Sequence, residues 1–377
     1  MVETKGEVNC MSTWRGAWIC LFCFSLFSVF AQQNVPAGQS EPTASVPPGS
    51  ANRRITLDVV VTDKSGKPVP GLQQQDFTLL DNKQPQKIVS FHAVEGGAAT
   101  ADPPVEAILL IDQVNTPFTK MGYAREQIEK YLRRNGGELV CPVSMVFVSD
   151  AGATIGDAPS RDGNALIAEL NQKEAVGLRT IRRSQGFYGA AERQQLSLQA
   201  LWQLVDHETA RPGRKLVIWI SPGWPLLTGP DVLVSSTQQQ GLFNSIVTFS
   251  DGLRRAGITL YHIDPLGMSD AAGWRTSYYE EFTKGVKSAK QVQIANLALQ
   301  VLAVQSGGRV LNSSNDVAGE IATCIADATA FYVLSFDALA GDGPNEYHAL
   351  EIKLDKPKLT ARTRSGYYAQ PEQKLAH

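Results

Sequence analysis

Residues 105–116 read Val-Glu-Ala-Ile-Leu-Leu-Ile-Asp-Gln-Val-Asn-Thr, an apolar run of strand-forming residues that ends in an acid and small polar groups. An uninterrupted apolar run is typical of a strand covered on both faces, as in a parallel sheet with helices on either side. In such sheets, ligands bind outside the carboxyl ends of the strands. We therefore expect Asp112 to lie where a metal ion or a polar ligand would be held.

Apolar strands and amphipathic helices alternate after this run. Further strands are predicted at 143–148, 215–220 and 258–264. Thr116-Pro117 predicts a helix start, with a capping residue before a proline at the first helical position. The alternation indicates an α/β domain over residues 103–330, with a doubly wound, mostly parallel, Rossmann-like sheet.

Both flanks of this domain show β patterning without a helical period. Strands are predicted at 55–61, 77–80 and 87–91 within an N-terminal β module of residues 53–95, with a turn at 81–83. Residues 331–370 carry further strands. Because the ends of a domain often lie close together, we expect the two flanks to form one sandwich-like β module.

The N-terminus has the pattern of an export signal. Arg15 precedes an apolar run over 17–31, which is too short for a membrane-spanning helix. We expect a signal peptide over 1–31 with cleavage near Ala31, then a disordered linker over 32–52, and a secreted or periplasmic mature protein without a membrane span. An uncleaved N-terminal anchor is the alternative.

Two cysteines, Cys141 and Cys324, remain after that cleavage. An oxidising compartment permits one disulfide between them. Alternatively, Cys324 is a small buried apolar residue, because it shares a helical face with Val317 and Ile321. The sequence leaves both alternatives open.

Composition and motifs argue against several function classes. Charged residues make up 19% of the chain and the formal net charge is −2, so no basic footprint for nucleic acid is present. The nucleophile elbow Gly-x-Ser-x-Gly, the zinc motif His-Glu-x-x-His and a dinucleotide-binding glycine motif after the first central strand are absent from the sequence. A non-enzymatic function is therefore expected.

Several short motifs together resemble one family. They are Val-Thr-Asp-x-x-Gly-Lys-Pro-Val at 61–69, Leu-Ile-Asp at 110–112 with Asn-Thr-Pro-Phe at 115–118, Pro-Gly-Arg-Lys at 212–215, Tyr-His-Ile-Asp-Pro-Leu-Gly at 261–267 and Arg-Ser-Gly-Tyr-Tyr at 364–368. The chain resembles the VWFA-related proteins of acidobacteria over roughly residues 55–369. The resemblance implies a von Willebrand factor A fold with β flanks and implies no established activity.

The resemblance also implies a location for a metal site. A working A domain holds Mg²⁺ through Asp-x-Ser-x-Ser after its first strand, a loop Thr and an Asp after a later strand. Here Asp112 is kept, Val114 and Thr116 replace the two serines, and Ser221 stands in place of the second Asp. We interpret this as a degenerate adhesion site that has lost oxygen ligands. No cofactor is expected, and weak binding of Mg²⁺ by Asp112, Thr116 and Ser221 is left open.

Loops after the central strands are expected to bind a partner, either a protein or a cell-surface component. Tryptophan, tyrosine and arginine are enriched at interface hot spots. The candidate residues are Asn115, Arg182, Tyr188, Trp224, Trp274 and Tyr278. Packing of these loops on one another is the alternative. The alternative function is that of a metal-dependent hydrolase that uses Asp112, Asp150 and Asp264.

Overall fold

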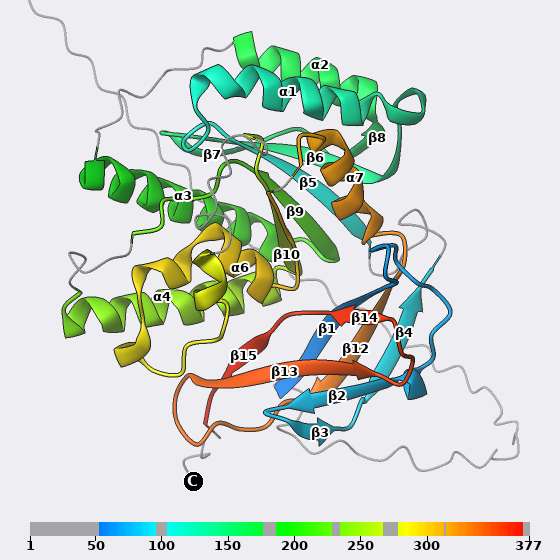
Figure 1. The fold of residues 1–377 in the computed structure, drawn as a ribbon, viewed down its shortest axis with the longest axis vertical. Coiled ribbons are helices and arrows are strands. Elements are labelled where there is room, and N and C mark those ends of the chain that lie inside the picture. The colour runs from blue at the N-terminus through cyan, green and yellow to red at the C-terminus, as the bar shows by residue number, and fades with distance from the viewer. Residues whose placement is uncertain are drawn as a thin grey trace, which may run out of the picture. The chain divides into compact units, whose positions relative to one another are not determined.

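The computed structural model describes residues 53–95, 104–175, 186–227, 234–266, 278–312 and 314–371 (Figure 1). All of them belong to one compact unit, Val46–His377. The predicted signal peptide and most of the predicted linker lie outside the described residues.

A seven-stranded, mostly parallel sheet forms the centre of the α/β domain. Its strand order is β11-β10-β9-β5-β6-β7, and β8 also pairs with β6. The parallel strands are β5 (Val105–Asp112), β6 (Glu138–Ser149), β9 (Arg214–Ile220), β10 (Ile258–Ile263) and β11 (Val310–Leu311). The edge strands β7 (Gly152–Ile155) and β8 (Ser160–Asp162) run antiparallel to β6. Every residue of β5, β9 and β10 is buried, as their apolar sequences predict.

Helices cover both faces of this sheet (Figure 1). The first face packs against α1 (Phe118–Leu132), α2 (Gly163–Ala175) and α7 (Val317–Ala326). The second packs against α3 (Gly186–Thr209), α4 (Ser236–Arg255) and α6 (Leu299–Gln305). Short 3-10 turns occur at η2 (Gln74–Asp76), η3 (Arg134–Gly137), η4 (Tyr278–Phe282), η5 (Ala289–Gln291) and η6 (Ile294–Leu297).

The strand order reverses between β5 and β9. The chain leaves β5 through α1 toward β6 on one side, and it leaves β9 through α4 toward β10 on the other. Ligand sites of doubly wound sheets lie at such a switch point, outside the carboxyl ends of the strands. Asp112 and Ser221 are therefore at the position where a site of this fold is expected.

Two antiparallel four-stranded sheets form the β module. One has the order β14-β1-β12-β4 and the other β15-β13-β2-β3. Their strands are β1 (Arg54–Thr62), β2 (Phe77–Asp81), β3 (Gln84–Gln86), β4 (Ser90–Val94), β12 (Phe331–Asp337), β13 (Glu346–Leu354), β14 (Thr360–Arg362) and β15 (Gly366–Ala369). Apolar side chains of both sheets share one core. The predicted fold class, an α/β sheet flanked by a sandwich built from both ends of the chain, is confirmed.

One predicted strand of this module, residues 87–91, overlaps the observed strand only at Ser90 and Phe91. The structure has β3 at Gln84–Gln86 and β4 at Ser90–Val94. Asn82 and Lys83 take positive φ angles of 48° and 69°, which form a tight turn from β2 into β3. The chain must then pass to the other sheet, where β4 pairs with β12, so residues 87–89 form the crossing.

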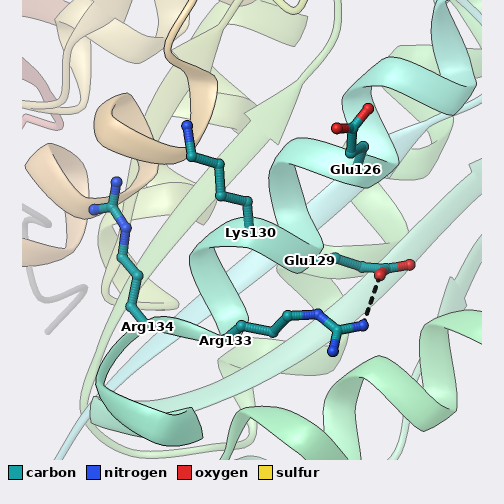
Figure 2. Close-up of a pocket in the computed structure, with 5 residues that line it drawn as sticks. All are labelled: Glu126, Glu129, Lys130, Arg133 and Arg134. Atoms are coloured by element: carbon teal, nitrogen blue, oxygen red, sulfur yellow. Dashed lines mark hydrogen bonds and ion pairs between the residues drawn. The ribbon is translucent and has the colours of Figure 1, made fainter.

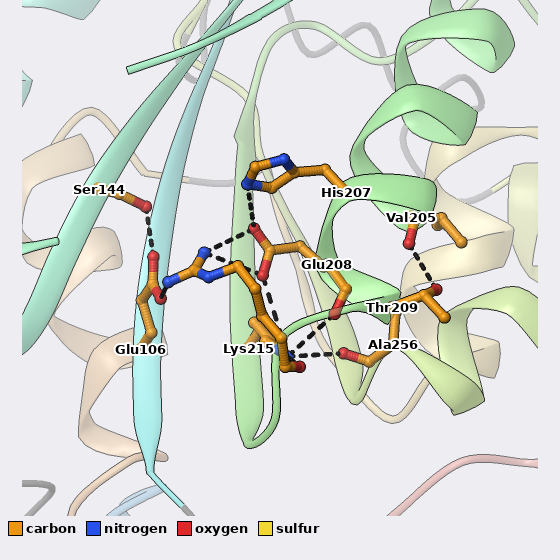
Figure 3. A network of polar contacts seen from close by, with 9 residues as sticks. Glu106, Ser144, Val205, His207, Glu208, Thr209, Lys215 and Ala256 are labelled. Atoms are coloured by element: carbon orange, nitrogen blue, oxygen red, sulfur yellow. Dashed lines mark hydrogen bonds and ion pairs between the residues drawn. The ribbon is translucent and has the colours of Figure 1, made fainter. Parts of the chain in front are cut away.

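A buried polar cluster closes the amino edge of the central sheet (Figure 3). Glu106 of β5 accepts hydrogen bonds from Ser144 and Arg211, each at 2.6 Å. Arg211 also pairs with Glu208 at 2.8 Å. The Lys215 ammonium donates to the carbonyl oxygens of Glu208, Arg211 and Ala256. Because α3 and α4 end here, Lys215 satisfies carbonyl groups at the carboxyl ends of both helices.

A second buried carboxylate joins the sandwich to the α/β domain. Asp327, fully buried after α7, accepts hydrogen bonds from Tyr261 at 2.9 Å and Arg309 at 3.1 Å. Arg362 of the sandwich strand β14 donates to the same carboxylate. Since one buried charge is shared by groups from both parts, it fixes the sandwich against the end of α7.

The sandwich core contains a buried Asp-His-Tyr cluster that allows a stability prediction. Asp81 accepts hydrogen bonds from His348 at 2.8 Å and Tyr367 at 2.6 Å. Asp81→Ala should lower the free energy of unfolding by about 3 kcal/mol, because it leaves two buried donors without an acceptor. Tyr367→Phe should cost about 1 kcal/mol, since only one hydrogen bond is lost. Denaturant unfolding checks both values; equal costs for the two variants would contradict this account.

Candidate functional site

The Asp112 carboxylate at the end of β5 is enclosed by N–H donors. Its Oδ1 accepts hydrogen bonds from the backbone N–H groups of Val114 at 2.8 Å and Asn115 at 2.9 Å. Its Oδ2 accepts from the Asn115 side-chain amide at 2.8 Å and the Trp219 indole at 2.9 Å. The side chain is fully buried.

This arrangement leaves Asp112 poorly suited to hold a cation. A carboxylate has about four lone-pair directions, and here four N–H groups use them. Burial raises the pKa of Asp112 above its ordinary value, while the hydrogen bonds from Asn115, Trp219 and the backbone act in the opposite direction. The geometry is that of a buried structural carboxylate that organises the loop after β5.

Ser221 and Thr116 follow the adjacent strands β9 and β5 at the same edge of the sheet as Asp112. The fully buried Ser221 accepts a hydrogen bond at Oγ from the Gly223 N–H at 3.1 Å. Its carbonyl oxygen lies 2.8 Å from His262 Nε2, so this ring nitrogen carries the proton and donates it. Val114 is fully buried in the apolar core of the second sheet face.

The predicted capping role of Thr116 is wrong. The N-cap of α1 is Pro117, which makes no side-chain hydrogen bond, because the helix begins one residue later than expected. Thr116 is 2% exposed, and its hydroxyl has no hydrogen-bond partner among the described residues.

The three carboxylates of the hydrolase alternative have different surroundings. Asp112 is buried, Asp150 is exposed, and Asp264 is half-buried and accepts a hydrogen bond from the Leu266 N–H at 2.9 Å. Within the described ranges, no three His, Cys, Asp or Glu side chains are grouped so that they could hold a metal ion.

The predicted partner-binding residues differ in their exposure to solvent. Tyr188 is 83% exposed and Tyr278 is half-buried. Trp224 is only 3% exposed and packs edge-on against Trp219 with ring centroids 5.0 Å apart, so its prediction as a contact residue is wrong. Its loop folds back because the indole fills the core of the second face. Asn115 is half-buried and donates to Asp112 and Ser197. Arg182 and Trp274 lie outside the described residues.

Sequence reasoning missed Phe118, the first residue of α1. Its side chain is 64% exposed at the carboxyl edge of the sheet. A large aromatic residue directly after the helix-start proline was the available signal, because a first-turn side chain has few neighbours to cover it.

Two pockets lie elsewhere. A shallow pocket on the outer surface of α1 is lined by Glu126, Glu129, Lys130, Arg133 and Arg134, and Figure 2 shows Arg133 paired with Glu129. The other lies at the amino edge beside the Glu106 cluster. It is bordered by Pro104, Pro142, Pro159 and Pro212. Neither contains a predicted site residue.

Cys141 and Cys324 are free, buried thiols in the core of the first sheet face. Burial raises the pKa of Cys141 to about 11 and that of Cys324 well above its ordinary value, so both thiols are protonated at neutral pH. Among the described residues, no helix combines the length and apolarity needed to cross a membrane.

No protein-family model and no curated protein matches the chain. Similar solved structures include the human COPII-coat protein Sec24c, with 10% identity, a TM-score of 0.32, and coverage of 76% of this chain and 47% of that one. The TFIIH p34 N-terminal domain has 11% identity and a TM-score of 0.26, and the match covers 43% of this chain and 81% of that domain. The pilus adhesin SpaC from Lactobacillus rhamnosus GG has 8% identity and a TM-score of 0.35, and the match covers 80% of this chain and 49% of the adhesin. The chain thus spans about half the length of Sec24c and SpaC. Membership of the VWFA-related family stays a prediction.

The buried His262 yields a pH prediction. Desolvation lowers its pKa to about 4, although its bond to the Ser221 carbonyl acts in the opposite direction. Since the unfolded chain binds this proton more readily, the contribution to stability is complete above about pH 6.5 and is lost as the pH falls toward 4. The loss should reach roughly 3 kcal/mol.

Denaturant unfolding at pH 7 and pH 4.5 measures this effect. His262→Gln keeps a side-chain amide donor but cannot titrate, so its stability should change less between the two pH values. The same change in both proteins would refute the assignment.

Proposed function

We propose that the chain is an exported, non-enzymatic binding module that engages a protein partner or a cell-surface component through the carboxyl edge of its central sheet. Export rests on the N-terminal sequence pattern alone. The observation that carries the binding proposal is the exposure of two aromatic side chains, Phe118 and Tyr188, at 64% and 83%.

Both aromatic residues are at the amino end of a helix. The helices run back from the carboxyl edge, so the starts of α1 and α3 lie toward that edge. At 1.5 Å per residue, the 24-residue α3 is about 36 Å long, whereas the seven-residue β9 measures about 23 Å. The start of α3 therefore extends beyond the sheet and presents Tyr188 to solvent.

The surroundings of Asp112 support recognition that does not depend on a metal ion. An adhesion site that works through Mg²⁺ needs open oxygen ligands, and the Asp112 oxygens accept four internal hydrogen bonds. Large apolar contacts would then supply the binding energy, which is the usual role of aromatic residues at interfaces.

Substitution of the exposed aromatic residues tests the proposed face. Phe118→Ala and Tyr188→Ala should each weaken the captured complex by roughly tenfold or more, because hot-spot truncations cost about 2 kcal/mol. Capture from envelope extract, followed by affinity measurement with the recovered partner, gives the comparison. Val140→Ala is the matched control, since Val140 is 44% exposed near the opposite edge. Equal binding by all three variants would reject this face.

Metal dependence is tested separately by calorimetry. We expect Mg²⁺ affinity in the millimolar range or weaker, because few protein oxygens are open to a reluctantly dehydrated ion. Partner capture should also be unchanged by a chelator. Micromolar Mg²⁺ binding that is abolished in both Asp112→Asn and Thr116→Val would show that a variant metal site is formed.

A further inference from the structure

Glu320 is a buried acid in the first turn of α7. It is 7% exposed, and its Oε2 has no hydrogen-bond partner among the described residues. Helix α7 packs on α1 and also contacts β9 and β10. An ionised carboxylate in such a seam lacks compensation for the water that it loses.

The charged groups around Glu320 do not supply that compensation. Asp264 follows β10 and Asp316 precedes α7, so two further carboxylates approach it. Lys130 of α1 donates a hydrogen bond to Asp316 at 3.3 Å. The positive charge of Arg134 in η3 also lowers the pKa of Asp316. The side chains of β9 in the core that α7 covers are Leu216, Ile218 and Ile220, which do not titrate. Burial, followed by repulsion from Asp264 and Asp316, raises the pKa of Glu320 to about 7.

We propose that Glu320 is a proton-controlled latch, whose protonated form keeps the first turn of α7 packed against α1 and β10. Loss of the proton leaves a buried negative charge beside two others. The turn then opens more readily, because opening exposes Glu320 to water and separates it from Asp264. This inference is independent of the proposed binding function.

The direction of the pH effect follows from proton linkage. The closed turn holds the proton up to about pH 7, whereas an opened, solvated glutamate releases it near its ordinary pKa of 4.5. Between these values the closed state binds more protons, so its stability falls as the pH rises. The opening constant should increase by up to about tenfold per pH unit from pH 5 to pH 7 and level off above.

Hydrogen-exchange mass spectrometry of the full chain between pH 5 and pH 8 tests the latch. Exchange of peptides covering 316–326 is corrected for the intrinsic pH dependence of amide exchange. Glu320→Gln keeps the shape of the side chain without a titrating proton. In this variant, the opening constant of the first turn of α7 should not change with pH. Its value should equal the low value that the natural protein shows at pH 5.

Two more variants complete the test. Asp264→Asn removes one repelling charge from Glu320. The pH above which the opening constant stops rising should therefore be lower in this variant. This measurement tests the latch even if Glu320→Gln does not fold. Glu126→Gln is the matched control, because Glu126 is exposed on the outer surface of α1 (Figure 2) and its variant should keep the natural pH dependence. A natural protein whose α7 opening does not change between pH 5 and pH 7 would overturn the proposal.

Discussion

The central strand β5 carries a buried carboxylate near each end, and the order around it depends on how these two charges are satisfied. A buried charge without partners is strongly destabilising, so each acid requires a specific set of donors. Glu106 collects Ser144 and Arg211 at the amino edge, and Arg211 in turn holds Glu208. Asp112 at the carboxyl edge collects the following loop and the Trp219 indole. The two acids thereby connect β5 to β6 through Ser144, to β9 through Trp219 and, by way of Arg211, to α3.

The same constraint determines what the switch point can do. A carboxylate at the end of a central strand can hold a metal ion only if its oxygens remain open. In this chain Trp219, from the neighbouring strand, and Asn115 occupy Oδ2, while Val114 is part of the apolar core. These contacts give Asp112 a structural role in the loop after β5. Recognition is then proposed for the helix starts around it, where Phe118 and Tyr188 are exposed.

The sandwich closes the domain through a third buried acid. Asp327 follows α7 and binds Tyr261 and Arg309 of the α/β domain together with Arg362 of β14. The residue that follows α7 is therefore held by hydrogen bonds from the α/β domain and from the sandwich. In the first turn of α7, Glu320 lies near two carboxylates, Asp264 and Asp316, that repel it. One short helix thus combines a fixed end with an end whose stability depends on a proton.

Apolar patterning along the sequence predicts the fold class and the central parallel strands. Uninterrupted apolar runs predict β5, β9 and β10 because a strand buried on both faces tolerates few polar residues, and alternation of Leu350, Ile352 and Leu354 with charged residues predicts β13. Contacts between residues far apart in the sequence depend on how the chain folds. The Trp219 indole donates a hydrogen bond to Asp112, which lies 107 positions earlier in the sequence. Trp224 is buried in the core, and Thr116 precedes the N-cap of α1 by one residue. Local patterns report which face of an element is apolar, whereas the partner of a polar atom depends on how strands and helices are placed in space.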